Sequence, residues 1–144
     1  MYTFQQSHVH FIARVVVGFV WIYHGAVPKL LFQHQDELAI VRSAGVSVES
    51  APTIVNWIGV AEILIGLCVL CGIPSVRWPF IFTILFGIGV TAGAAIQLPH
   101  FLVAAFNPVS LNVQLIALSV IGLISVRDSH SAPLSQESGR KTVP

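Results

Sequence analysis

Charged residues are scarce in this sequence. Only 9% of its 144 residues are Asp, Glu, Lys or Arg, whereas hydrophobic residues make up 55%. A water-soluble domain carries about 25% charged residues, because its surface must be hydrated. The mean hydropathy of +0.83 points the same way, and a net charge of +1 gives no reason to expect a nucleic-acid partner. Composition therefore favours an integral membrane protein in contact with a lipid bilayer.

Cysteine is scarce as well. Cys68 and Cys71 lie inside an apolar run, so a secreted disulfide framework is not indicated. The pair matches C-x-x-C, the spacing of thiol–disulfide enzymes, but no charged residue stands nearby to stabilise a thiolate. We favour small apolar fillers, with a membrane thiol oxidoreductase as the alternative. The sequence also lacks a glycine-rich phosphate loop and any metal-ligand cluster of recognisable spacing.

Four apolar stretches are long enough to cross a bilayer, which needs roughly 20 helical residues. They run over about 9–27, 54–72, 79–98 and 110–126, with prolines at their boundaries. The first does not resemble a signal peptide, because Arg14 lies inside it and no lysine or arginine precedes it. We predict an all-α fold, a four-helix transmembrane bundle in one domain (residues 1–127), followed by a disordered polar tail (128–144).

The lysines and arginines indicate an orientation. Four spans place both termini and the second loop on one side of the membrane. That side holds Arg77, Arg127, Arg140 and Lys141, whereas the other holds Lys29 and Arg42. We therefore expect both termini in the cytoplasm, in a bacterial inner membrane.

The loop between the first two stretches has a helical pattern. Residues 35–44 are predicted to form a short helix ended by Gly45, with Leu38, Val41 and Ala44 on one face. We interpret this helix as a connector at the membrane surface. The alternative is a lid over a site.

Small residues recur on two of the predicted helices. Gly89 and Gly93 form a GxxxG motif, and Gly59 and Gly66 stand seven residues apart. Such residues let helices approach closely in membranes. We predict packing surfaces within one bundle, with a face for a homo-oligomer as the alternative.

Glu62 is the most informative polar residue. It lies about 12 Å into its helix at 1.5 Å per residue, close to mid-membrane. An ionised, unpaired carboxylate there would cost a few kcal/mol. Glu62 is therefore either protonated or paired with a donor from another helix.

The first predicted helix supplies candidate partners. One stripe follows a 4-3-4-3 spacing and contains His10, Arg14, Val17, Trp21 and His24. Arg14 is within side-chain reach of Glu62 in depth, and Trp21 lies at about the depth of Glu62. Three interpretations stay open: a structural Arg14–Glu62 pair, a site for a small ligand, quinone head group or proton, and Arg14 extended to the interface beside a protonated Glu62.

A second polar group gathers at the outer end of the bundle. It comprises His24, Lys29 and Asn107, with Gln97 and His100 nearby. Asn107 precedes a helix, so capping of backbone N–H groups is one interpretation and a binding site is the other. Haem is disfavoured, because no second helix carries histidines that match His10 and His24.

Three segments resemble the DoxX-like family of membrane proteins. They are Trp21-Ile22-Tyr23-His24-Gly25 followed by Pro28-Lys29-Leu30, then Gly59-Val60-Ala61-Glu62-Ile63-Leu64-Ile65-Gly66, and Phe106-Asn107-Pro108-Val109-Ser110-Leu111-Asn112. The resemblance covers nearly the whole chain except the tail. It implies four membrane helices with a buried glutamate in the second, and its motifs are short.

The resemblance also implies a role linked to redox chemistry. Some members of the family are subunits of a thiosulfate:quinone oxidoreductase, and others are proposed to act in thiol and superoxide handling. Our first hypothesis is therefore a redox-associated membrane subunit that works with a redox-enzyme partner. It would bind a small lipophilic molecule such as a quinone near Glu62, Trp21, His24, Arg14, Lys29 and Asn107. A non-catalytic scaffold or assembly partner is the alternative.

Overall fold

The computed structural model describes residues 2–73, 75, 77–103 and 107–128, and within these ranges the side chains from residue 8 to residue 126. All regular structure in these ranges is helical. In chain order the elements are α1 (Tyr2–His24), η1 (Gly25–Leu31), α2 (Gln35–Ser43), α3 (Ala51–Cys71), α4 (Trp78–Gln97), η2 (Pro99–Leu102) and α5 (Pro108–Asp128). Residues 129–144, where the sequence predicts a disordered tail, lie outside the described residues.

Four helices are long and apolar enough to cross a membrane: His8–Leu31, Ala51–Cys71, Trp78–Gln97 and Pro108–Val126. This confirms the predicted all-α fold with four spans. Large apolar side chains point outward from all of them, including Phe19, Leu64, Leu85 and Ile124. A surface of this kind requires lipid around it, so the protein is an integral membrane protein.

The first span does not end where the sequence predicts. Pro28 was expected to close the helix, but the chain continues through it as the π-helix η1. In a π-helix the N–H groups bond five residues back, as Phe32 N–H does to Val27 O at 3.1 Å. The wider turn accommodates a proline ring that would interrupt an α-helix. As a result, Lys29 lies on the span.

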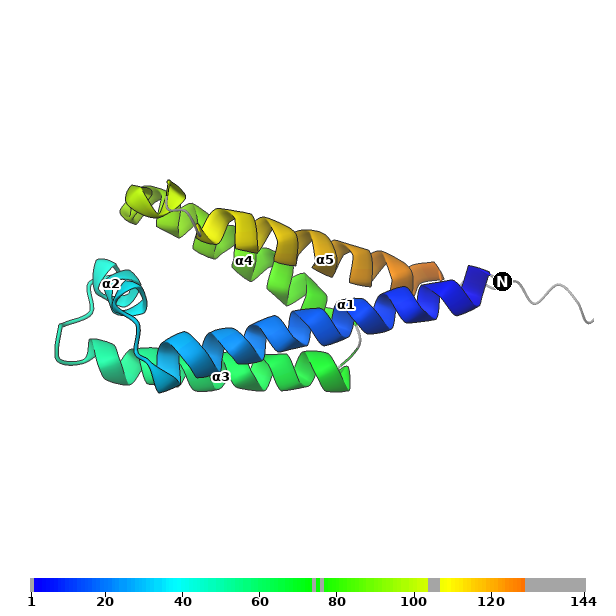
Figure 1. The fold of residues 1–144 in the computed structure, drawn as a ribbon, viewed down its shortest axis with the longest axis horizontal. Helices are drawn as coiled ribbons and strands as arrows, with labels where there is room; N and C mark the ends of the chain where they lie inside the picture. Colours follow the sequence, from blue (N-terminus) through cyan, green and yellow to red (C-terminus); the bar gives the residue numbers. More distant parts are fainter. Residues whose placement is uncertain (1, 74, 76, 104–106, 129–144) are drawn as a thin grey trace, which may run out of the picture.

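The helices form two pairs that diverge. Figure 1 shows α3 along α1 and α4 along α5, with the pairs close together near the start of α1 and apart at the end that carries α2. α1 also packs against α5, whereas α3 and α4 have few contacts. The molecule is therefore open at the α2 end between the two pairs.

Glycines bring α1 and α3 into close contact. A methyl group added to Gly25 would come within 2.4 Å of Gly59 O, and one added to Gly66 within 2.8 Å of Gly18 O. The two helices are antiparallel, and seven residues separate the glycines on each. The predicted packing role of Gly59 and Gly66 is thus confirmed, and it fixes the register of the segment that carries Glu62.

The same prediction is wrong for Gly89 and Gly93 on α4. Nothing lies within 4 Å of a methyl group added at either position. The reason is the divergence of the pairs, since α4 moves away from α3 toward the α2 end (Figure 1). Within the described residues nothing packs against the two glycines themselves, although Thr91 between them accepts a hydrogen bond from Asn112 of α5 at 2.9 Å.

The connector forms the short helix expected from its sequence. α2 packs Leu38 and Val41 against Ala51 and Val55 of α3, and Gly45 follows it with φ of 90°. Ala44, predicted to share that face, is exposed because the helix ends at Ser43.

Candidate functional site

The mid-membrane carboxylate is paired with a lysine. The Lys29 Nζ of η1 lies 2.9 Å from a carboxylate oxygen of Glu62 on α3, and their side chains are only 6% and 8% exposed. Gly59 and Gly66 bracket Glu62, so the close contact of α1 and α3 places both partners in one buried interface. The ammonium therefore faces the carboxylate at ion-pair distance inside the apolar part of the protein, and among the described residues Glu62 Oε2 has no hydrogen bond of good geometry.

A second carboxylate reaches the same ammonium. The Lys29 Nζ lies 3.1 Å from Glu37 Oε1, and the Glu37 side chain is 19% exposed. Glu37 comes from the first turn of α2, outside the four spans. We call Lys29, Glu37 and Glu62 the charged triad. With all three groups ionised, one ammonium faces two carboxylates, and the triad carries one excess negative charge.

One of the three interpretations of Glu62, a structural pair with Arg14, is wrong. Arg14 donates instead to the carbonyl oxygen of Leu70, near the end of α3. Side chains on a helix tilt toward its N-terminus. Arg14 therefore extends away from the level of Glu62, whereas Lys29, farther along the same span, extends back toward it. Spacing along the helix therefore does not decide the partner of Glu62, whereas the direction of the side chains does.

An apolar cleft opens between α1 and α5. It has a volume of about 360 Å³, and its walls come from Val16, Phe19, Val20, Tyr23, His24, Leu111, Gln114, Leu115 and Leu118. Its polar side-chain groups are the Tyr23 hydroxyl, the His24 imidazole and the Gln114 amide. The cleft thus offers a long apolar surface with hydrogen-bonding groups toward one end.

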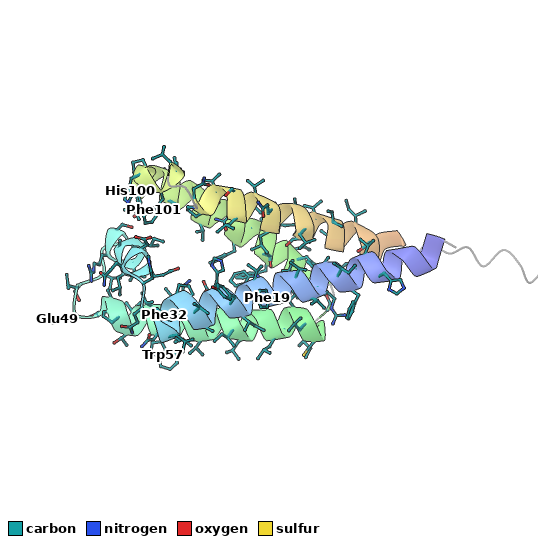
Figure 2. The ribbon with its side chains drawn as sticks, in the orientation of Figure 1. Phe19, Phe32, Glu49, Trp57, His100 and Phe101 are labelled. Atoms are coloured by element: carbon teal, nitrogen blue, oxygen red, sulfur yellow. The ribbon has the colours of Figure 1, made fainter. Side chains whose placement is uncertain are left out.

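A second cleft adjoins the first and leads to the charged triad. Its volume is about 430 Å³, and it shares Tyr23, His24 and Leu111 with the apolar cleft. The rest of its lining comes from η1, α2 and the tips of the other pair: Val27, Pro28, Phe32, His34, Asp36, Glu37, Ile40, Phe101 and Pro108. Figure 2 shows Phe32 and Phe101 on opposite sides of the open end. The two clefts therefore share wall residues, and Glu37, which binds Lys29, lines the second cleft, whereas Lys29 and Glu62 line neither.

Two predicted ligand-binding residues have structural partners. Trp21 is buried, donates its indole N–H to Thr83 Oγ1 at 2.9 Å and packs against the rings of Phe82 and Phe86 at tilted angles. It therefore fastens α1 to α4. Asn107 accepts a hydrogen bond from Ser110 N at 2.8 Å, which is the capping arrangement considered for it. Of the six residues predicted to bind a ligand, His24 lines the clefts and Lys29 and Glu62 lie in the triad.

His10, another polar residue of the first span, also has contacts within the protein. Its Nδ1 lies 3.2 Å from the Gly122 carbonyl oxygen of α5, and its ring packs edge-on against Phe80. Cys68 and Cys71 are free thiols on the exposed side of α3, and neither lines a cleft. The polar groups that line the open end are therefore His24, Gln114, His34, Asp36 and Glu37.

Sequence reasoning missed Glu37 and the glycines of α1. Glu37 was assigned only to the first turn of the connector helix, because its contact with Lys29 depends on how α2 folds back. A signal for the α1–α3 contact was present, however. Gly18 and Gly25 have the same spacing as Gly59 and Gly66, and matched spacings on two apolar helices indicate a shared interface.

The fold and its buried ion pairs define a class: a small integral membrane protein of four candidate spans with an intramembrane charged site. Residues 18–120 match the model of the DoxX-like family. The matched region contains the triad, the second cleft, all of the first cleft except Val16, and most of the four spans, and the chain belongs to the DoxX-like family. No curated protein and no solved structure matches the chain.

Proposed function

We propose that this protein binds a small lipophilic molecule with a polar, oxygen-containing head group, of which a quinone is the leading example. It would do so as a redox-associated membrane subunit that hands this molecule to, or receives it from, a partner enzyme. The observation that carries the proposal is the apolar cleft between α1 and α5, which leads to His24, Glu37 and, through Glu37, to Lys29.

The dimensions and lining of the clefts support a ligand of this kind. Small-molecule sites have volumes of about 300–1,000 Å³ and combine apolar walls with a few placed polar groups. Leu115, Leu118 and Val20 offer an apolar surface for an alkyl tail. The Gln114 amide and the His24 imidazole can each hydrogen-bond a carbonyl or hydroxyl oxygen. An amphiphile with its tail toward the closed end would thus place its head group near the triad.

The location of the triad gives a second line of support. Ionisable groups inside membrane spans are costly and mark functional sites more often than structural ones. Lys29 also lies in a π-helical segment, and such segments occur frequently at functional sites. A carboxylate-rich cluster beside a quinone-type head group would supply groups able to exchange protons with it.

Filling the shared wall of the clefts tests the proposal. Leu111 lines both clefts and is 49% exposed, whereas Leu85 on α4 is 65% exposed and lines neither. We expect Leu111→Trp to weaken binding of a benzoquinone with a ten-carbon tail at least about tenfold, a change of 1.4 kcal/mol, and Leu85→Trp to leave it unchanged. Calorimetric titration in lipid nanodiscs measures both. Equal affinities for the two variants would refute binding in the clefts.

A scaffold role is the second candidate, and one observation favours it. The space around Gly89 and Gly93 is open within the described residues, an arrangement that lets a helix of another copy or another protein approach closely. A pure scaffold predicts that the wild-type protein does not bind the quinone in the titration above. The same experiment therefore separates the two candidates.

We also propose that the protein lies in a bacterial inner membrane with both termini in the cytoplasm. The distribution of lysine and arginine supports this orientation. It places α2 on the periplasmic side. A cysteine introduced at exposed Ser43, with Cys68 and Cys71 replaced, should then react with a membrane-impermeant maleimide in cells whose outer membrane has been permeabilised. Labelling only after the inner membrane is disrupted would reverse the orientation.

A further inference from the structure

We infer that Glu37 occupies, in the ligand-free protein, the position that an oxygen of the ligand takes on Lys29, and that α2 moves with Glu37 when the ligand enters. This inference rests on the proposed function. It assigns Lys29 as the group that recognises the head group and restricts the ligand to one with a hydrogen-bond-accepting oxygen, such as a quinone carbonyl.

The two carboxylates on Lys29 are not equally anchored. Glu62 lies in the middle of the 21-residue helix α3, whose backbone is held against α1 at Gly59 and Gly66. Glu37 lies in the first turn of a helix of nine residues, and its side chain is more exposed than that of Glu62. If one carboxylate leaves Lys29, it is therefore Glu37.

The ends of α2 have the geometry of hinges. Gln33 precedes the helix with φ of 42°, and Gly45 follows it with φ of 90°. A positive φ is costly for a residue other than glycine, and at Gln33 it accompanies a hydrogen bond from its side chain to Asn56 Oδ1 at 2.8 Å. Between these points α2 is held to α3 chiefly by Leu38 and Val41. Rotation about two loop positions requires the loss of this apolar contact, against which Val46, Ile54 and Ile58 also pack, and of the Glu37–Lys29 ion pair.

The position of Glu37 links α2 to the cleft. Glu37 lines the second cleft while it binds Lys29, so a head group that enters this cleft meets Glu37 before it meets the ammonium. After exchange, Lys29 and Glu62 remain as a neutral pair that donates a hydrogen bond to a neutral carbonyl. Glu37 moves with α2 toward water, where an ionised carboxylate is most stable.

Weakening the Glu37–Lys29 contact should therefore strengthen binding. A glutamine has the same size as glutamate but competes less strongly for an ammonium. We expect Glu37→Gln to lower the dissociation constant for the ten-carbon benzoquinone at least about threefold, because the open state is more populated before binding. Glu49→Gln is the matched control, since Glu49 is an exposed carboxylate on the loop after α2 and points away from the helices in Figure 2. It should leave the constant unchanged.

A distance measurement on the otherwise wild-type protein tests the movement independently. Spin labels are attached at Ser43 on α2 and Val113 on α5, which are both exposed, after Cys68 and Cys71 have been replaced. Double electron–electron resonance then reports the separation of the two helices. We expect a longer or broader distance distribution in Glu37→Gln and after addition of the benzoquinone. An unchanged distribution in both samples would refute the movement of α2.

The outcomes separate this inference from the proposed function. If the wild-type protein binds the benzoquinone and Glu37→Gln binds it equally or less tightly, Glu37 does not compete with the ligand and the inference is wrong. If neither the wild-type protein nor Glu37→Gln binds it, the proposed function fails, and the inference fails with it.

Discussion

Replacing Lys29 by methionine should destabilise the protein strongly. Methionine is close to lysine in length and has no charge, so Lys29→Met removes the ammonium while filling most of its space. Glu62 would then be left in a buried interface, with its side chain 8% exposed and its partner at 2.9 Å lost. Glu37 would lose the same partner but has an exposed side on which to meet water.

The magnitude follows from the distance and the burial. At 2.9 Å and an effective dielectric constant of about 20, the attraction between unit charges is about 6 kcal/mol. Desolvation of both groups offsets much of this attraction in the intact pair. Removing one partner leaves that cost uncompensated, and the measured loss for such changes is about 3–5 kcal/mol. For a chain of this size, the melting temperature would fall on the order of 10 °C.

The assay is thermal unfolding in a mild detergent, with a double-variant cycle to isolate the pair. Lys29→Met combined with Glu62→Gln removes both charges, so it should recover most of the stability lost in Lys29→Met alone. Arg42→Met serves as the control, because Arg42 is exposed at the end of α2. A surface substitution of this kind changes stability by about 0.5 kcal/mol or less.

Two results would contradict the reasoning. If Lys29→Met unfolds at the temperature of the wild-type protein, then Glu62 does not depend on Lys29 for its charge. If the double variant is as unstable as Lys29→Met, then the loss comes from packing of the lysine side chain and not from an unpaired carboxylate.

The remaining predictions concern the contacts that position the site. Trp21→Phe should destabilise the protein by about 1–2 kcal/mol, because a buried hydrogen bond to Thr83 is lost. Trp57→Phe, at an exposed position, should have little effect. Equal melting temperatures for the two variants would contradict this prediction. Gly66→Ala should cost about 1–3 kcal/mol, since its methyl group would lie 2.8 Å from Gly18 O. Gly93→Ala, with open space around it, should be neutral or stabilising by up to about 1 kcal/mol. If Gly93→Ala melted at a lower temperature than Gly66→Ala, the close contact at Gly66 would not determine stability.

The fold followed from the sequence because its determinants are local. Apolar length and prolines located the four spans, and Gly45 marked the end of the connector helix, which the structure ends at Ser43. Pro28 was the exception, because a proline ordinarily ends an α-helix and the sequence offers no indication that the next turn is π-helical. Ending the first span before Pro28 placed Lys29 in the loop, whereas the structure has it in the span.

The site was only partly predictable because it depends on long-range geometry. Glu62 stood out from its sequence context alone, since a carboxylate in mid-membrane requires a partner. The choice between Arg14 and Lys29 depended on the direction of side chains along α1, which the sequence determines only after the antiparallel register with α3 is known. Glu37 could not be assigned before the path of the connector was known, because its contact requires α2 to fold back over η1.

The central claim is that the clefts between α1, α2 and α5 hold a lipophilic molecule with an oxygen-containing head group. Mass spectrometry of molecules that co-purify with the protein in a mild detergent tests it most directly. We expect the wild-type protein and Leu85→Trp to retain a quinone-type molecule in similar amount. Leu111→Trp should lose this molecule. Equal retention by all three proteins, or no such molecule in the wild type, would contradict the claim.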